Sequence, residues 1–283
     1  RGLVDYDAPV ATYWPEFARN GKSGVTVRHL LTHSAGLHRI RSLVGDAHRM
    51  LDWEHMCEAL AAAAPAYTPG TRHGYHALTY GWLVGEVVRR VSGLSIADFV
   101  RVELAEPLEL DGLTIGLPAA SRSRVAPLAP LGIPRPTWGP ARRIEKQIGT
   151  GMGKVVSALP VPVNTRRLAN ALAPRGVEDV LVGTAIMEAE VPSANGFFTA
   201  RALGRTYAML AGGGELDGVR VLSPETVSAA ATVQSHGLDL VLVVPMDWRL
   251  GYHRVFTSRG TVGPAFGHFG FGGSAIPARW AAS

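Results

Sequence analysis

The chain has 283 residues, of which 47% are hydrophobic and 18% are charged, and its single cysteine is Cys57. This composition excludes a disordered tail and a fibrous protein. One thiol excludes an internal disulfide, and no Cys/His spacing indicates a structural zinc site. The longest apolar stretches fall far short of the ~20 residues that a membrane-spanning helix needs, so we expect no transmembrane segment.

The net charge is +5, which is compatible with a nucleic-acid or anionic-membrane partner. The basic residues cluster only at Arg122 with Arg124, at Arg142 with Arg143 and at Arg166 with Arg167. None of these clusters alternates with aromatic residues, as a stacking platform for bases would. We therefore expect solvated loops and no nucleic-acid partner. The first residues lack the pattern of a secretory signal peptide, which favours a cytoplasmic location.

The first part of the chain predicts short helices. Residues 25–37 predict a helix that ends in a turn, with Gly36 as a left-handed cap. An amphipathic, alanine-rich pattern predicts a second helix over residues 52–64. Proline and glycine then break the pattern, so a loop leads from this helix to Tyr75.

A longer helix is predicted over residues 78–92, where Gly81 and Gly85 allow close packing. Gly93 ends this helix, and Ser95 is the expected N-cap of the next one, over 96–105. Residues 117–164 are rich in Pro, Gly and Arg and predict an irregular surface excursion.

The remaining elements alternate between helices and strands. Helices are expected from about Thr165, over 200–210, and after Ser223, which is a typical N-cap followed by proline. Strands are expected over 219–222, 238–244 and 249–256. We expect a single domain with its helical region over about 25–235 and its sheet strands over about 238–275.

Three candidate motifs carry little weight. His29 and His33 are four residues apart, as in a zinc helix, but Leu30 stands where a metalloprotease has glutamate. Histidines that hydrogen-bond the following turn are the better interpretation. Residues 149–154 have a phosphate-loop spacing that is one residue short, and no Gly-x-Ser-x-Gly elbow occurs.

Four ordered segments together resemble the serine β-lactamase-like family, which includes class C β-lactamases, penicillin-binding peptidases and related carboxylesterases. The segments are Val25–Leu37; Pro69-Gly70 with Tyr75 and the helix 81–88; Asn195–Ala200 with Leu222–Pro224; and Gly267–Gly273. The resemblance spans nearly the whole chain. It implies an α+β fold in which a helical subdomain lies beside an antiparallel sheet.

The resemblance also implies a mechanism with no cofactor and no metal. A serine hydroxyl must lose its proton to a base as it attacks, which forms an acyl-enzyme. Tyr75 would relay this proton, with its pKa lowered by a nearby cation. His268 and Gly270 would line the cleft, with His268 in the place of the lysine of true β-lactamases. The backbone N–H of Phe271 would stabilise the charge on the substrate oxygen.

The second motif departs from the lactam-hydrolysing pattern Tyr-x-Asn, since the chain reads Tyr75-His76-Ala77. His76 and Ala77 would lie in the substrate cleft, where the alanine removes an amide that would bond a substrate amide. This favours a carboxylesterase acting on small esters over a β-lactamase or D-Ala-D-Ala peptidase acting on a lactam or peptide.

The family's nucleophile motif, Ser-x-x-Lys, does not occur in the 283 residues. The lysines are Lys22, Lys146 and Lys154, and the residues three positions before them are Arg, Arg and Gly. We therefore expect a copy truncated at both ends, with reduced stability or a need for a partner. A non-catalytic protein that binds a small acyl or peptide-like ligand is the rival hypothesis.

Overall fold

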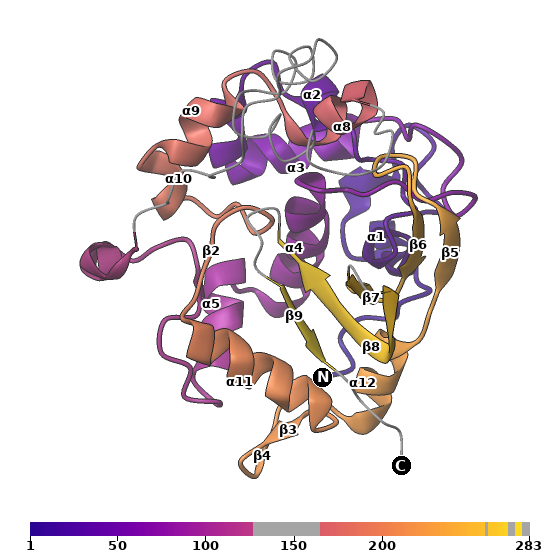
Figure 1. Cartoon of the computed structure of the whole chain (residues 1–283). Helices are drawn as coiled ribbons and strands as arrows, with labels where there is room; N and C mark the ends of the chain where they lie inside the picture. Colours follow the sequence, from indigo (N-terminus) through magenta and orange to yellow (C-terminus); the bar gives the residue numbers. More distant parts are fainter. Residues whose placement is uncertain (127–164, 258–259, 271–274, 279–283) are drawn as a thin grey trace.

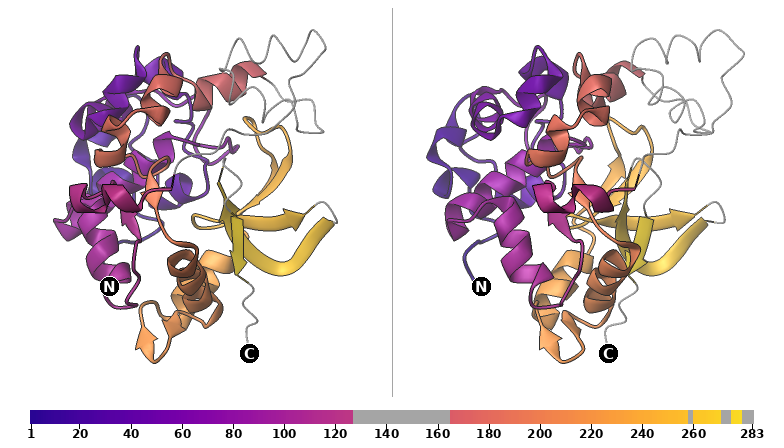
Figure 2. Two further views of the ribbon diagram at one scale, coloured as in Figure 1. Left: turned by 60° about the vertical axis from the view of Figure 1, so that its left-hand side comes forward. Right: turned by 90° about the vertical axis from the view of Figure 1, so that its left-hand side faces the viewer.

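The computed structural model describes residues 1–126, 165–257, 260–270 and 275–278. A lobe of helices lies beside a five-stranded antiparallel sheet (Figures 1 and 2). This is the α+β arrangement that the resemblance implied. Within the described ranges, no helix has both the length and the apolar character to cross a lipid bilayer.

Short helices make up most of the helical lobe. They are η1 (Val10–Thr12), η2 (Pro15–Ala18), α1 (Val27–Leu31), α2 (Ile40–Leu43), η3 (Ala47–Leu51), α3 (Trp53–Ala62), α4 (Thr79–Ser92), α5 (Ile96–Val100), η4 (Arg101–Ala105), η5 (Ala119–Arg124), α8 (Thr165–Leu172), α9 (Val177–Val182) and α10 (Ala185–Glu188). Two further helices follow, α11 (Ala200–Ala211) and α12 (Pro224–Ala231). Of these, α11 packs against the sheet at β9 (Figure 2).

The strands form one sheet and two small ribbons. In the sheet, the order is β5 (Ser235–Leu238), β6 (Pro245–Trp248), β7 (His253–Thr257), β8 (Gly260–Phe269) and β9 (Ala275–Ala278), and each strand pairs with the next along the chain. The ribbons are β1 (Thr114–Ile115) with β2 (Gly196–Phe197) and β3 (Glu215–Leu216) with β4 (Val219–Arg220).

Capping residues explain most of the helix boundaries. Ser95 and Ser223 accept backbone N–H bonds at the starts of α5 and α12, and Gly93 ends α4 with φ 72°. These predictions are confirmed. The prediction for Gly36 is wrong, because α1 ends at Leu31 with Thr32 as its cap. Gly36 has φ 77°, and a side chain there would press on the backbone of residues 66 and 67. Glycine therefore allows the chain at residues 66 and 67 to pass close to residue 36.

The strand expected over 238–244 is also wrong. The strands are β5 and β6, and residues 239–244 form the loop that joins them. Asp239 causes this break, since its carboxylate accepts the backbone N–H groups of Val241 and Leu242 at 2.8 and 2.9 Å. An aspartate that bonds its own downstream backbone stabilises a turn and competes with a strand.

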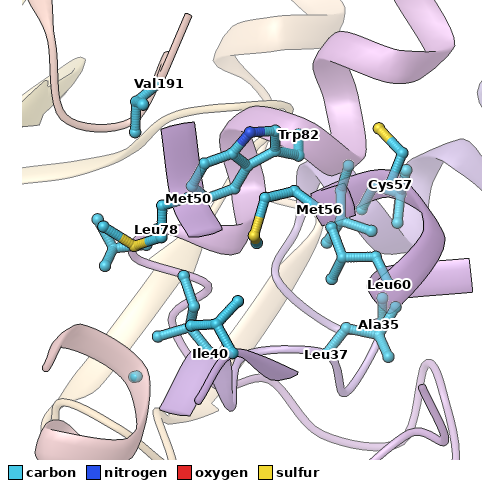
Figure 3. Close-up of a cluster of buried hydrophobic side chains, with 14 of the residues drawn as sticks. Ala35, Leu37, Ile40, Met50, Met56, Cys57, Leu60, Leu78, Trp82 and Val191 are labelled. Carbon is cyan, nitrogen blue, oxygen red and sulfur yellow. The ribbon is translucent and has the colours of Figure 1, made fainter. Parts of the chain in front are cut away.

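The core of the helical lobe forms around α4. Trp82 is fully buried, and Figure 3 shows its indole among Met50, Met56 and Leu78. On the same helix, the missing Cβ of Gly81 leaves room for the backbone of Ser193. This confirms the prediction of close packing.

Replacing Gly85 with alanine tests that packing. The new Cβ would lie 2.6 Å from Cη2 of Trp53, so we expect Gly85→Ala to lower the free energy of unfolding by roughly 1–3 kcal/mol. Gly204, within α11, has nothing within 4 Å of the same position. Gly204→Ala is the matched control and should raise stability by about 0.5–1 kcal/mol. Urea unfolding of both variants measures the difference, and equal changes would contradict the packing argument.

A buried carboxylate ties α3 to α4. Glu86 is fully buried and accepts hydrogen bonds from the indole of Trp53 and from the guanidinium groups of Arg89 and Arg90. Burial alone would raise the pKa of this carboxyl, but the hydrogen bonds outweigh it and lower the pKa to about 2. Its stabilising effect is therefore complete above pH 4.5 and is lost as the pH falls through about 2.

We expect Glu86→Gln to lower the free energy of unfolding at pH 7 by roughly 3 kcal/mol, because the guanidinium groups of Arg89 and Arg90 lose their buried anionic partner. The variant should also lose much of the wild-type decline in stability between pH 4.5 and 2. Glu54→Gln is the control, since Glu54 is exposed and forms an ion pair with Arg89; we expect a change within about 0.5 kcal/mol. Denaturant unfolding at several pH values measures both, and equal losses would contradict the role of Glu86.

Candidate active site

A cavity of about 410 Å³ opens between the helical lobe and the sheet. Its lining includes the polar side chains of Tyr75 and His268 and apolar side chains such as Val84 and Ile115. Its volume is within the range of small-molecule sites in proteins. The cavity is therefore the candidate active site.

The structure brings Tyr75 and His268 together. Tyr75 lies in the loop before α4 and His268 lies in β8, yet their ring centroids are 5.8 Å apart. His253 of β7 is beside them, with its ring centroid 5.0 Å from that of His268. Residues 193 positions apart in the sequence thus meet at the boundary of the two lobes, as a shared site requires.

Tyr75 is held by the loop between β5 and β6. Its backbone N–H donates to Oδ1 of Asp239 over 3.2 Å, and its ring stacks on Trp248 with centroids 5.7 Å apart and planes 13° apart. The indole of Trp248 donates to Oδ2 of the same aspartate over 3.2 Å. One fully buried carboxylate therefore fixes both the backbone and the ring position of Tyr75.

The expectation of a lowered pKa for Tyr75 is wrong for the described residues. Burial and, to a smaller extent, the charge of Asp239 raise the pKa of this phenol to about 12. At neutral pH, Tyr75 is a neutral phenol that can donate a proton. It would need an additional cation beside it to become a base.

His33 occupies the centre of this aromatic cluster. Its ring lies 4.2 Å from that of Trp248, 4.9 Å from that of Tyr80 and 5.2 Å from that of Tyr75, between centroids. Its Nδ1 accepts the backbone N–H of His76, and burial lowers its pKa well below the usual value. His33 is thus neutral, with its proton on Nε2, and it supports the wall of the cavity.

The interpretation of the histidine pair is corrected by these contacts. The two histidines were expected to hydrogen-bond the turn that follows them. Instead, Nδ1 of His29 accepts the N–H of Thr26, just before α1, and Nδ1 of His33 accepts the N–H of His76 in a distant loop. Within the part of the chain that the structure describes, no group of three or more His, Cys, Asp and Glu side chains is placed to hold a metal ion.

His76 and Ala77 both line the cavity, but the His76 imidazole is structural. Its Nε2 accepts the N–H of Leu37 over 2.8 Å, and burial lowers its pKa to about 3. It is fully buried. The ring therefore stays neutral and fixes the chain after α1. Both residues lie at the cavity as expected, and their contact with a substrate stays a prediction.

Of the two residues that the resemblance places beside the substrate oxygen and the cleft, Gly270 is described and Phe271 is not. Gly270 follows β8 directly and is exposed. Phe271 and the phosphate-loop-like residues 149–154 lie outside the described residues. The role of the Phe271 N–H therefore stays a prediction.

The loop that contains Pro192 and Ser193, which line the cavity, depends on Asn195. Its side-chain amide donates to the carbonyl groups of Ile186 and Ala189, and its Oδ1 accepts the N–H of Val191 over 3.1 Å. These bonds hold the turn that presents Ser193 to α4, where the Ser193 hydroxyl accepts the N–H of Gly81. The resemblance included Asn195 in a matched segment but did not indicate that its side chain holds this turn.

Sequence reasoning missed Asp239, Trp248 and His253 as parts of the site. His33 lies in Val25–Leu37, the first segment that carries the resemblance, and only the resemblance could have identified it as part of the site. The bonds of Asp239 to Val241 and Leu242 are local, but no local pattern marks its bonds to Tyr75 and Trp248.

Comparisons with known proteins identify the family of the chain. The family profile described as Beta-lactamase matches residues 1–279. The chain is 40% identical over 284 residues to the esterase/beta-lactamase LipL of Mycobacterium tuberculosis H37Rv, covering 97% of this chain and 60% of LipL. It thus spans about three fifths of the length of this curated relative.

Two solved structures are similar over almost the whole chain. One is a penicillin-binding protein homologue from Caulobacter crescentus, with a TM-score of 0.76 and 36% identity. The other is a family VIII carboxylesterase, with a TM-score of 0.79 and 34% identity. Each comparison covers 98% of this chain and 68% of the other. The chain belongs to the Beta-lactamase family and has the serine β-lactamase/transpeptidase-like fold.

Proposed function

We propose that the protein hydrolyses small carboxylic esters through an acyl-serine intermediate. The observation that carries the proposal is the meeting of Tyr75 and His268 across the cavity, with ring centroids 5.8 Å apart. A phenol and an imidazole at a cleft can move protons to and from a reacting oxygen. The similarity to LipL and to a family VIII carboxylesterase supports the same reaction class.

Two residues favour an ester over a lactam or a peptide. Ala77 lines the cavity where the family's lactam-hydrolysing members have asparagine, so this position offers no amide to bond a substrate amide. His268 takes the place of the family's lysine, so this position holds no permanent positive charge. An ester needs neither group.

In this proposal Tyr75 is the proton carrier. As a neutral phenol it donates to the leaving alkoxide, and a lysine placed beside it would lower its pKa so that it can also accept a proton. We propose that the family's serine and lysine come from residues outside these 283. The apolar wall formed by Val84, Ile96 and Val100 is suited to an apolar helix face that carries them.

The second candidate function is a non-catalytic protein that binds a small acyl or peptide-like ligand. The observation that favours it is the absence of Ser-x-x-Lys from the 283 residues. The cavity and its aromatic walls would then serve binding alone.

The test compares the 283-residue chain with the natural protein that includes any residues flanking it in the gene. Both are incubated with short-chain p-nitrophenyl esters and, separately, with a chromogenic cephalosporin. We expect ester turnover by the natural protein, weaker or no lactam turnover, and acylation of a serine that precedes a lysine by three positions. The 283-residue chain should show no catalytic turnover of either substrate.

The outcomes separate the candidates. Ligand binding without turnover by the natural protein would contradict ester hydrolysis and support the binding function. Faster lactam than ester turnover would support a β-lactamase instead. Mass spectrometry of the acylated peptide identifies the nucleophile in either case.

A further inference from the structure

A serine and histidine pair lies outside the cavity residues described above. Ser235 begins β5, and His73 lies in the loop before Tyr75; the Ser235 Oγ and His73 Nδ1 are 2.7 Å apart. We infer that Ser235 is an acylation site, in which His73 acts as general base toward activated acyl and phosphonyl electrophiles. This inference does not rest on the proposed ester hydrolysis.

The hydrogen bonds fix the direction of proton transfer. Nε2 of His73 lies 3.0 Å from the carbonyl oxygen of Gly237, and a carbonyl oxygen can only accept. The proton of the neutral imidazole is therefore on Nε2, and Nδ1 is the acceptor for the Ser235 hydroxyl. A nucleophile bonded to a base that a third group orients is the arrangement of activated serines.

The surroundings keep the base fixed and leave the hydroxyl accessible. His73 is 4% exposed, and its carbonyl accepts the N–H of Leu240 over 3.0 Å, so both its ring and its backbone are anchored. Ser235 is partly exposed and lies on β5, which has one neighbour, β6, in the described sheet. An electrophile can approach an edge strand from solvent.

Three other serines are suitable references because their hydroxyls bond backbone groups. Ser42 and Ser92 donate to the backbone carbonyl groups of Arg39 and Val88, which cannot take a proton. The Ser223 hydroxyl accepts the N–H of Thr226 at the start of α12. Neither arrangement increases nucleophilicity, so these serines provide internal references.

The reaction is balanced within the pair and its electrophile. With an alkyl fluorophosphonate, a bond forms between Ser235 Oγ and phosphorus, the P–F bond breaks, and fluoride leaves. The hydroxyl proton passes to Nδ1 of His73. With an activated ester, the bond to the leaving alkoxide breaks instead, and His73 returns the proton to that alkoxide, which leaves an acyl-Ser235.

The experiment exposes the 283-residue chain to an alkyl fluorophosphonate and maps adducts by peptide mass spectrometry over time. We expect Ser235 to be modified faster than Ser42, Ser92 or Ser223. Ser235→Ala should remove this adduct, and Ser223→Ala, the matched control, should leave its rate unchanged. Modification of Ser235 no faster than of the reference serines would overturn the inference.

Two substitutions test the role of His73. His73→Gln can keep a donor to the Gly237 carbonyl, and His73→Asn can keep an acceptor for the Ser235 hydroxyl, but neither side chain is a base. Whichever variant retains the wild-type circular dichroism and melting temperature should lose at least about 100-fold in the Ser235 modification rate. An unchanged rate in a folded variant would also overturn the inference.

Discussion

Tyr75→Phe is expected to lower kcat for ester hydrolysis by the natural protein by about 10²–10⁴-fold, because it removes the one group proposed to carry the proton. The substitution deletes a hydroxyl and leaves the ring stacked on Trp248 and the backbone bonded to Asp239. We therefore expect KM and the melting temperature to change little. Steady-state kinetics with a p-nitrophenyl ester, together with thermal unfolding, measures these effects.

The matched control is Tyr13→Phe. The Tyr13 hydroxyl accepts the N–H of Asp5 in an exposed turn, so its loss should leave kcat unchanged. Equal activity of Tyr75→Phe and wild type would show that a different group moves the proton, and it would remove Tyr75 from the proposed mechanism. A large fall in melting temperature would instead assign Tyr75 a structural role.

The end of α4 and the starts of α5 and α12 could be predicted because their signals are local. Ser95, Ser223 and Gly93 act within one turn of the helix end that they define, so a short window of sequence contains the whole cause. The spacing of Gly81 and Gly85 likewise follows from one helix. Only their partners, such as Trp53, required the structure.

The loop between β5 and β6 and the site residues Asp239, Trp248 and His253 could not be predicted, because many of the contacts that place them join residues far apart in the sequence. Residues 239–244 are apolar enough to predict a strand, yet Asp239 is satisfied by Tyr75 and Trp248 together with its own turn. The turn bonds of Asp239 are local, and its bonds to Tyr75 and Trp248 come from other parts of the fold; together they override the local strand preference. The meeting of Tyr75 and His268 could be expected only from the resemblance, since no periodicity relates them.

Asp239→Asn is expected to cost roughly 3 kcal/mol of unfolding free energy, because an amide cannot replace this carboxylate. One oxygen of Asp239 accepts three backbone N–H groups, including that of Tyr75, and the other accepts the indole N–H of Trp248. An asparagine that keeps the backbone bonds turns its NH₂ group toward the indole N–H, so two donors face each other. The exposed Asp111, which pairs with Arg124, supplies the control, and Asp111→Asn should change stability by at most about 0.5–1 kcal/mol.

A double-mutant cycle isolates this donor conflict. Trp248→Phe retains an aromatic ring for Tyr75 but removes the indole N–H, so it leaves one buried oxygen of Asp239 without its donor. In the double variant, the asparagine NH₂ group no longer opposes a second donor, and we expect the combined loss to be smaller than the sum of the single losses by about 1–2 kcal/mol. Urea unfolding of the four proteins at pH 7 measures this coupling. Additive losses would mean that Asp239 and Trp248 act independently, and Tyr75 would then owe its position to the backbone bond alone.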